Sequence, residues 1–361
     1  MRILALALTA ALVATACGGT TLAPTPTPRI VQATTVVATA ALSSTPAPAP
    51  VTLKWGSISS ASDSALFIAE AKGYFAQQGI TLDTQVFTTA ANMVGPLGQD
   101  QIQVGGGVVG AGLFNAIARG INIKIVGDKG DLDPGNGFEA IVVRSQLADR
   151  VKGPADLKGR TYAMASLDIT PEVTLNTYLG TGGLTVKDVN IVTLGFPDMQ
   201  NALETGRIDA AGPIEPWLTK IVEAGVAKVL VRSDEITPGQ QQSVLLFSEQ
   251  FAKRRDVAVR FMVAYLEGAR FYNDAFVKKD PAKRAEAARI LAKATKLDPA
   301  LFAKMTMPGI DPNGKVNVDW LQKDQQYFVG KGTQAKAVDL STAVDPSFAS
   351  DAVTILGGPY Q

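Results

Sequence analysis

The residue types that most often carry catalytic chemistry are nearly missing from this sequence. It contains no His, and its only Cys is Cys17. Without His there is no Ser-His-Asp or Cys-His arrangement, no imidazole base and no His-ligated metal. A single Cys permits neither a disulfide nor a thiolate cluster. A mechanism that uses a carboxylate, Lys or Tyr remains open, and the sequence itself indicates neither a metal nor a cofactor.

Polar residues and glycines instead gather in short stretches that follow predicted strands. In a doubly wound sheet these stretches lie beside helix amino termini, where ligands bind. The candidate ligand contacts are Ser59, Ser62, Asp63, Thr89, Asn92, Gly106, Gly107, Ser166, Asp168, Thr170, Asp198, Glu215 and Trp217. Each also has a structural interpretation: the hydroxyls and acids as helix caps, the glycines as a tight turn, and Trp217 as a core residue.

The charges on these stretches suggest a class of ligand. Five acids lie on or near them, and Lys129 is the main base among them. This balance favours an amine or a neutral N-heterocycle over nitrate or a sulfonate, and Trp217 could stack on a planar ring or a cation. Helix amino termini bind anions without Lys or Arg, so an anionic ligand stays open. The acidic run 128–133 lacks the final Glu of a calcium loop and is predicted to be a solvated turn.

Length and composition indicate a globular protein. The chain has 361 residues, 46% hydrophobic and 19% charged, with 34 Gly and 20 Pro. That length is enough for at least two compact domains. The balance of 34 basic against 33 acidic residues argues against a nucleic-acid binder.

Apolar runs of strand length alternate with helical patterns from residue 51 onward. Strands are predicted at 51–56, 80–87, 102–104, 121–127, 140–143, 161–165, 188–194, 210–212, 227–230 and 243–247. Helices are predicted at 64–76, 90–97, 111–119, 169–179, 198–205, 215–224, 256–274 and 282–295. This order is typical of an α/β fold with doubly wound sheets.

The amino terminus has the pattern of an export signal followed by a tether. A basic Arg2 precedes the apolar stretch 3–16, whose 14 residues fall short of the roughly 20 that span a bilayer. Cys17 follows Ala14-Thr15-Ala16 in a sequence that resembles a bacterial lipobox, although Leu is usual at the position of Ala14. We therefore predict a lipoprotein signal peptide at 1–17 with lipidation of Cys17, plain secretion being the alternative. Residues 18–50, rich in Thr, Pro and Ala, are predicted to be an extended linker.

Three ordered motifs carry a family resemblance. They are the stretch from Ala69 to Ile80 (AEAKGYFAQQGI), the stretch from Asp156 to Ala163 (DLKGRTYA), and the stretch from Ala202 to Ala211 (ALETGRIDAA) followed by PIEPW at 213–217. In this order the chain resembles periplasmic substrate-binding proteins of the SsuA/THI5-like, or NMT1-like, group, which serve ABC importers of nitrate, sulfonates, taurine and thiamine precursors.

The resemblance implies a two-lobed, type II periplasmic-binding-protein fold with a hinge of two crossover segments, near 141–144 and 243–247. Lobe 1 would comprise 51–141 plus 247–361, and lobe 2 would comprise 142–246. It implies a monomeric, extracytoplasmic protein, lipid-anchored to the cell membrane, that is not an enzyme. Such a protein closes over a small molecule and delivers it to an ABC permease and ATPase.

The two rival functions are an enzyme and a ligand sensor. A related enzyme makes the thiamine pyrimidine with a His and a Cys-rich iron site, and this sequence lacks the residues for that route. A ligand-sensing lipoprotein that presents a signal to a membrane partner remains the alternative.

Overall fold

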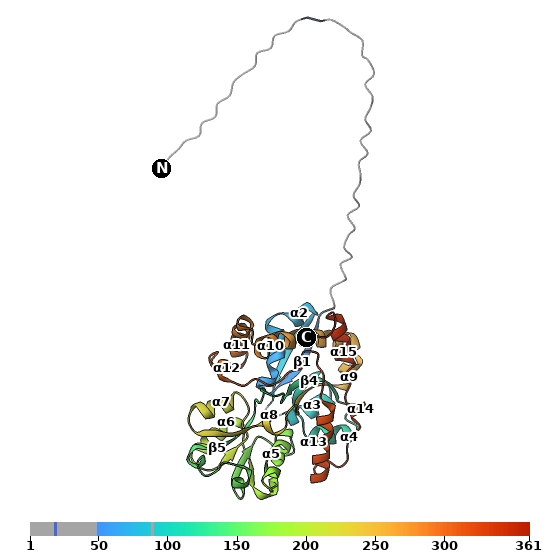
Figure 1. Cartoon of the computed structure of the whole chain (residues 1–361). Helices are drawn as coiled ribbons and strands as arrows, with labels where there is room; N and C mark the ends of the chain where they lie inside the picture. Colours follow the sequence, from blue (N-terminus) through green and yellow to red (C-terminus); the bar gives the residue numbers. More distant parts are fainter. Residues whose placement is uncertain (1–17, 20–48, 88–89) are drawn as a thin grey trace, which may run out of the picture. The chain divides into compact units, whose positions relative to one another are not determined.

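The computed structural model describes residues 18–19, 49–87 and 90–361. The predicted signal peptide with Cys17, nearly all of the predicted linker, and Thr89 lie outside the described residues. The described residues from 49 onward form one compact unit that holds two five-stranded sheets covered by helices (Figure 1). Within the described part of the chain, no helix is both long and apolar enough to cross a membrane.

The first sheet has the strand order β2-β1-β3-β10-β4. Its strands are β1 (Val51–Ser57), β2 (Ile80–Val86), β3 (Val104–Val108), β4 (Lys124–Asp131) and β10 (Gln241–Phe247). Strand β1 runs parallel to β2 and β3, whereas β10 lies between β3 and β4 and is antiparallel to both. The sheet is therefore mixed.

The second sheet has the order β7-β6-β8-β5-β9. Its strands are β5 (Ala140–Arg144), β6 (Thr161–Met164), β7 (Asn190–Thr193), β8 (Ala210–Ala211) and β9 (Ala227–Arg232). Strand β6 runs parallel to β7 and β8, and β5 is antiparallel to β8 and β9. In each sheet the fourth strand of this order, β10 or β5, is antiparallel to both of its neighbours. The predicted two-lobed α/β fold is confirmed.

Sheet membership corrects the predicted lobe boundaries. The chain leaves the first sheet at Asp131 and enters the second at Ala140, so the whole of β5 belongs to the second sheet. It returns before Gln241, since β10 pairs with β3 and β4. Placing residues up to 246 in lobe 2 was wrong because an isolated apolar run does not reveal which sheet accepts it. The crossovers are the stretch just before β5 and the stretch that leads into β10 and ends at Gln242.

Both faces of each sheet are buried. Along β10, Leu245 and Phe247 pack into one hydrophobic cluster, whereas Val244 and Leu246 pack into another. Successive strand side chains point to opposite faces, so a strand covered on both sides is apolar throughout. Strand β5 follows the same rule, with alternate residues in the two clusters that flank the second sheet.

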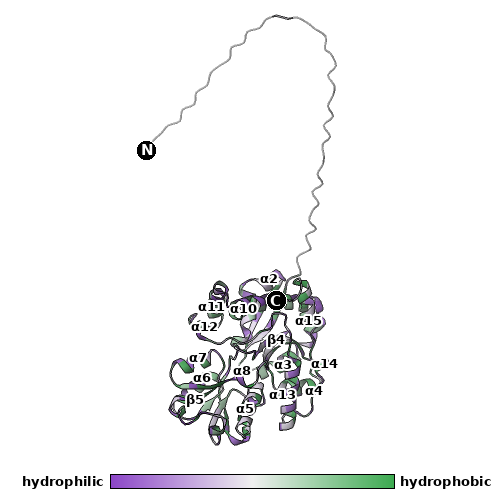
Figure 2. Ribbon diagram, viewed as in Figure 1, coloured by the Kyte–Doolittle hydropathy of each residue, from purple (hydrophilic) through white to green (hydrophobic). Residues whose placement is uncertain are grey.

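Helices cover these faces, and most of them match predicted ones. They are α1 (Ser64–Ala71), α2 (Tyr74–Gln77), α3 (Val94–Gly98), α4 (Ala111–Ala118), α5 (Thr170–Thr181), α6 (Phe196–Glu204), α7 (Trp217–Glu223), α8 (Ser233–Ile236), α9 (Glu249–Lys253), α10 (Arg255–Phe276), α11 (Pro281–Thr295), α12 (Leu301–Lys304), α13 (Val318–Lys331), α14 (Leu340–Ala343) and α15 (Ser347–Ile355). Figure 2 shows hydrophilic residues along α11, whereas α10 is buried along most of its length.

The helix α10 anchors the core of the first sheet. Phe261 of α10 packs against Phe247 of β10 and Phe251 of α9, with ring centroids 5.6 and 6.3 Å apart in edge-to-face geometry. Each such pair contributes about 0.5–1.5 kcal/mol beyond the burial of its area. This packing fixes β10 in the first sheet and so holds one end of the second crossover in place.

Candidate functional site

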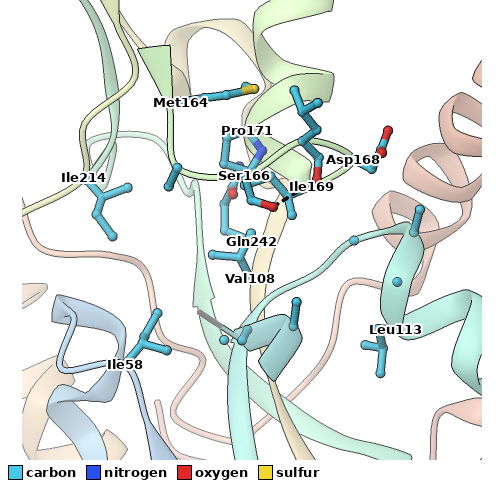
Figure 3. Close-up of a pocket in the computed structure, with 18 of the residues that line it drawn as sticks. Ile58, Val108, Leu113, Met164, Ser166, Asp168, Ile169, Pro171, Ile214 and Gln242 are labelled. Atoms are coloured by element: carbon cyan, nitrogen blue, oxygen red, sulfur yellow. Dashed lines mark hydrogen bonds between the residues drawn. The ribbon is translucent and has the colours of Figure 1, made fainter. Parts of the chain in front are cut away.

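A cavity of about 640 Å³ lies between the two sheets. Its walls come from segments that follow strands in both sheets and from the two crossovers (Figure 3). This is the position at which open α/β sheets bind ligands, and the volume falls in the range of roughly 300–1,000 Å³ common for small-molecule sites. It is the candidate functional site.

The wall from the first lobe is almost entirely apolar or glycine. It includes Ile58 after β1, Ala90 and Ala91 after β2, and the stretch from Gly110 to Leu113 that begins α4. Figure 3 shows Ile58 pointing into the cavity from this side. The small residues at the start of α4 leave the backbone at the surface of the cavity.

The wall from the second lobe adds aromatic and sulfur-containing side chains. It is formed by the stretch from Met164 to Ile169, by Phe196 at the start of α6, and by Ile214 and Trp217 near the start of α7. The crossovers contribute Phe138 and Gln242. The cavity is thus bounded by both lobes and by the segments that join them.

Four of the predicted contacts line the cavity. These are Gly107, Ser166, Asp168 and Trp217. The Ser166 hydroxyl donates to the carbonyl oxygen of Leu167 at 3.2 Å, which leaves its lone pairs available as acceptors. The ammonium of Lys220 lies 4.4 Å from the ring centroid of Trp217. The structure brings these residues together at one site, and their contact with a ligand stays a prediction.

The other described candidates do not line the cavity. They are Ser59, Ser62, Asp63, Asn92, Gly106, Thr170, Asp198 and Glu215. Ser59, Asn92 and Asp198 are exposed, and the remaining five are buried. Several of the buried ones form ion pairs or hydrogen bonds within the protein, which explains why a polar residue occurs at these positions.

Asp63 and Ser62 hold a buried lysine. The Asp63 carboxylate lies 2.5 Å from the ammonium of Lys129, both side chains being fully buried, and Lys129 also donates to the Ser62 hydroxyl at 3.0 Å. Asp63 further accepts from the Ser57 hydroxyl at 2.7 Å. A buried charge needs such partners to offset its desolvation. These two residues therefore position β4 against the start of α1.

Thr170 and Glu215 also bond within the protein. The Thr170 hydroxyl donates to Oε1 of Gln242 at 2.7 Å, which orients a crossover side chain that does line the cavity. Glu215 accepts from the Thr219 amide and hydroxyl at 3.0 and 2.8 Å and so caps α7. It also accepts from the Thr306 amide at 3.2 Å. Burial raises the pKa of the Glu215 carboxyl.

The glycine-rich stretch is a strand and not the expected loop. Gly106 and Gly107 lie within β3, opposite Leu245 and Val244 of β10. A Cβ at Gly106 would lie 2.6 Å from Cδ of Lys129, and one at Gly107 would lie 2.6 Å from Cβ of Ala90. These glycines therefore make room for neighbouring chain segments, and their backbones belong to the sheet. The prediction that they form a ligand-binding loop was wrong on this point.

The acidic run is solvated only at its end, where Asp133 is exposed. Strand β4 continues to Asp131, and Asp128 is fully buried. Burial raises the pKa of the Asp128 carboxyl to about 7, although it accepts from the amides of Gly130 and Asp311 at 2.9 and 2.7 Å. No group of three or more acids or other metal-binding side chains has the geometry of a metal site in the part of the chain that the structure describes.

The cavity is much less acidic than its flanking sequence suggested. Among the described residues that line it, Asp168 alone has a charged side chain. That carboxylate pairs with Lys331 at 2.8 Å, and Figure 3 shows it at the rim, turned away from Ile214. The other acids of the loops point elsewhere, so the structure does not support the acidic cleft on which the preference for an amine rested.

Backbone and side-chain bonds join the two lobes beside the cavity. The Ala111 amide donates to the backbone carbonyl oxygen of Asp168 at 2.9 Å, and the Thr170 amide donates to the backbone carbonyl oxygen of Val109 at 3.0 Å. These bonds flank an isolated bridge between Gly110 and Ile169.

A lysine reinforces the junction. Lys331 of α13 pairs with Glu172 as well as with Asp168 of the other lobe, and the Tyr327 hydroxyl donates to Glu172 at 2.8 Å. Burial lowers the pKa of Lys331, but its two carboxylate partners outweigh burial and raise the pKa above the usual value.

Sequence reasoning missed the apolar part of the site. Ile58, Phe138, Met164 and Ile214 line the cavity, but in the sequence they resemble ordinary core residues. The only available signal was their position next to the polar candidates. Gln242 was missed because it precedes the predicted strand 243–247 and so lies outside the stretches that follow predicted strands.

Comparison with known proteins agrees with the fold. Residues 45–292 match the model of the NMT1-like family, so the chain belongs to that family. A Brucella abortus protein named as a binding protein is 27% identical over 284 residues, covering 75% of this chain and 83% of its own length. A Brachyspira hyodysenteriae protein named as an ABC transporter periplasmic binding protein is 26% identical over 200 residues, covering 52% of this chain and 56% of its own length.

Solved structures share the same architecture. The alkanesulfonate-binding protein SsuA from Xanthomonas axonopodis pv. citri, bound to MOPS, superposes with a TM-score of 0.66 at 21% identity, over 83% of this chain and all of that one. The desulfurization enzyme DSZB superposes with a TM-score of 0.59 at 17% identity, over 84% and 99%. At these identities the likeness concerns the fold.

Proposed function

We propose that this chain is an extracytoplasmic, lipid-anchored solute-binding protein that captures a small molecule between its lobes and delivers it to the permease and ATPase of an ABC importer. The observation that carries the proposal is the cavity of about 640 Å³, which is walled by both lobes and by both crossovers. Membership of the NMT1-like family and the names of the two relatives, as binding proteins, support it.

The geometry suggests how binding is coupled to a change of shape. A ligand that touches Ile58 in one lobe and Trp217 in the other contacts both walls only when the lobes are close. Such a ligand favours the closed form by the difference in its affinity for the two forms. The interlobe bonds at Gly110 and Lys331 stabilise the same closed form, so ligand and protein contacts act together.

Uptake measurements test the transport function. Cells that lack this chain should lose uptake of a compound that the purified protein binds, and the wild-type chain should restore it. A Trp217→Ala variant should restore it poorly, whereas Val222→Ala should restore it fully. Val222 is the control because it lies on the same helix, α7, is 37% exposed and does not line the cavity. Binding with unchanged uptake in the deleted cells would favour a ligand sensor.

Lipid anchoring needs a separate test. The wild-type chain should partition into detergent, and mass spectrometry should find acyl groups on Cys17. A Cys17→Ser variant should partition into the aqueous phase. Equal partitioning of the two proteins would contradict the anchor and leave the solute-binding role intact.

A further inference from the structure

We infer that the ligand is an uncharged, mostly aromatic small molecule with one or two polar atoms. The inference rests on the proposed solute-binding function and adds the chemical class of the solute. It comes from three properties of the cavity: its charge, the state of its hydrogen-bonding groups, and the aromatic residues in its wall.

The cavity lacks a partner for a charged group. Within the described residues, no Lys or Arg lines it, and its single acid, Asp168, already pairs with Lys331. An ion that leaves water for an apolar site loses several kcal/mol unless it is paired. A sulfonate, nitrate or amine would therefore enter with its charge uncompensated by these side chains.

The amino terminus of α5, which borders the cavity, has its first donors already in use. At α5, the Thr170 amide bonds to Val109, Pro171 has no N–H, and the Glu172 amide bonds to Ile169. An anion held by a helix amino terminus needs first-turn amides that are unoccupied. The α5 terminus does not offer them.

The terminus of α6 behaves similarly. Pro197 has no N–H, and the amides of Asp198 and Met199 both bond to the Gly195 oxygen. Asp198 also adds a negative charge to this first turn, which opposes a second anion. Two helices that border the cavity are thus poorly suited to bind a sulfonate or nitrate.

The polar side chains of the wall are mostly bonded as well. Gln242 accepts from Thr170 and donates to Gln240 at 3.0 Å. Asn115 donates to the Thr333 oxygen at 2.8 Å and accepts from the Ala335 amide at 3.2 Å. The Ser166 hydroxyl retains acceptor capacity, which suits one O–H or N–H of a ligand.

Aromatic rings supply the remaining contacts. Phe87, Phe138, Phe196 and Trp217 line the cavity from both lobes and from a crossover. Flat rings stack on or pack edge-to-face against such residues with about 0.5–1.5 kcal/mol beyond area burial. A volume of about 640 Å³ also exceeds what nitrate or taurine would fill and leaves room for a larger, ring-containing molecule.

Three probes with one skeleton test the class. Naphthol, naphthalenesulfonate and naphthylmethylamine are titrated calorimetrically into the full chain carrying Cys17→Ser, with taurine and nitrate as small ions. We expect naphthol to bind at least tenfold more tightly than either charged naphthalene, and Ser166→Ala to weaken naphthol severalfold. Tighter binding of the sulfonate, the amine or a small ion would overturn the inference and keep the solute-binding function. Absence of naphthol binding would overturn it too, and the uptake experiment then decides the proposed function separately.

A charge variant sharpens the result. Ile58→Lys places an ammonium in the wall at a half-buried position, and Ile355→Lys is the control because Ile355 is 63% exposed on α15, away from the cavity. The ratio of naphthalenesulfonate affinity to naphthol affinity should rise at least tenfold in Ile58→Lys and stay unchanged in Ile355→Lys. Thermal unfolding verifies that both variants fold. An unchanged ratio in a folded Ile58→Lys protein contradicts the inference.

Discussion

Replacement of Gly110 by Ala tests whether the backbone bridge between the lobes sets the balance of open and closed forms. Gly110 has an extended backbone with φ −166°, which any residue adopts, so the change adds no backbone strain. A Cβ here, however, would lie 2.6 Å from the backbone carbonyl oxygen of Asp168 and 3.0 Å from Cγ2 of Ile169. Protein interiors are close-packed and such a contact is repulsive. The two segments must move apart.

The expected magnitude follows from the bonds that this movement breaks. They are the bond from the Ala111 amide to Asp168, at 2.9 Å, and the bond from the Thr170 amide to Val109, at 3.0 Å. Each contributes about 0.5–1.5 kcal/mol net, so the closed form should lose about 1–3 kcal/mol. The ratio of closed to open molecules should therefore fall by about 5- to 150-fold.

Single-molecule energy transfer measures this ratio. Because Cys17 is the only Cys, a Cys17→Ser background accepts dyes at Lys187→Cys and Lys293→Cys, two exposed positions in different lobes. Gly112→Ala is the matched control, since Gly112 lines the same cavity and a Cβ there meets nothing within 4 Å. If the variants of Gly110 and Gly112 give the same distribution of distances, the reasoning is refuted.

Three further predictions concern buried and interlobe charges. Lys129→Met leaves the fully buried Asp63 carboxylate without its cation, so denaturant unfolding should show a loss of about 3–5 kcal/mol; a loss under about 0.5 kcal/mol would contradict the pair. Burial raises the pKa of the Glu139 carboxyl from 4.5 to about 8. The contribution of this group to the free energy of unfolding is therefore full below pH 4.5 and is lost as the pH rises towards 8. Glu139→Gln should flatten the fall of the unfolding free energy between these pH values by up to about 1.4 kcal/mol per pH unit, and parallel curves would refute the assignment. Lys331→Met removes the interlobe pair with Glu172 and should increase the open fraction severalfold in the energy-transfer assay, whereas an unchanged fraction would show that the pair does not hold the lobes together.

The sequence predicted the class of fold because its signals are local. Alternating apolar runs, helical periodicity and the family motifs all depend on residues close together in the chain. They correctly predicted two α/β lobes and most of the helices. They failed for β10, whose sheet is decided by pairing with β3 and β4, more than a hundred residues earlier.

Part of the candidate site could also be predicted from local sequence. Ser166, Asp168 and Trp217 were predicted to lie at a cleft, and they line the cavity because segments that follow strands meet between the two sheets. Whether they contact a ligand is for experiment.

Side-chain direction was beyond the reach of sequence reasoning. Asp63 has the residue type of a ligand contact. In the fold, however, Lys129, which is distant in sequence, forms a buried ion pair with it. The sequence by itself determined which elements form and roughly where the cleft lies. Only the tertiary structure decided the character of the cleft, because burial requires each charge to find a partner, and those partners come from distant parts of the chain.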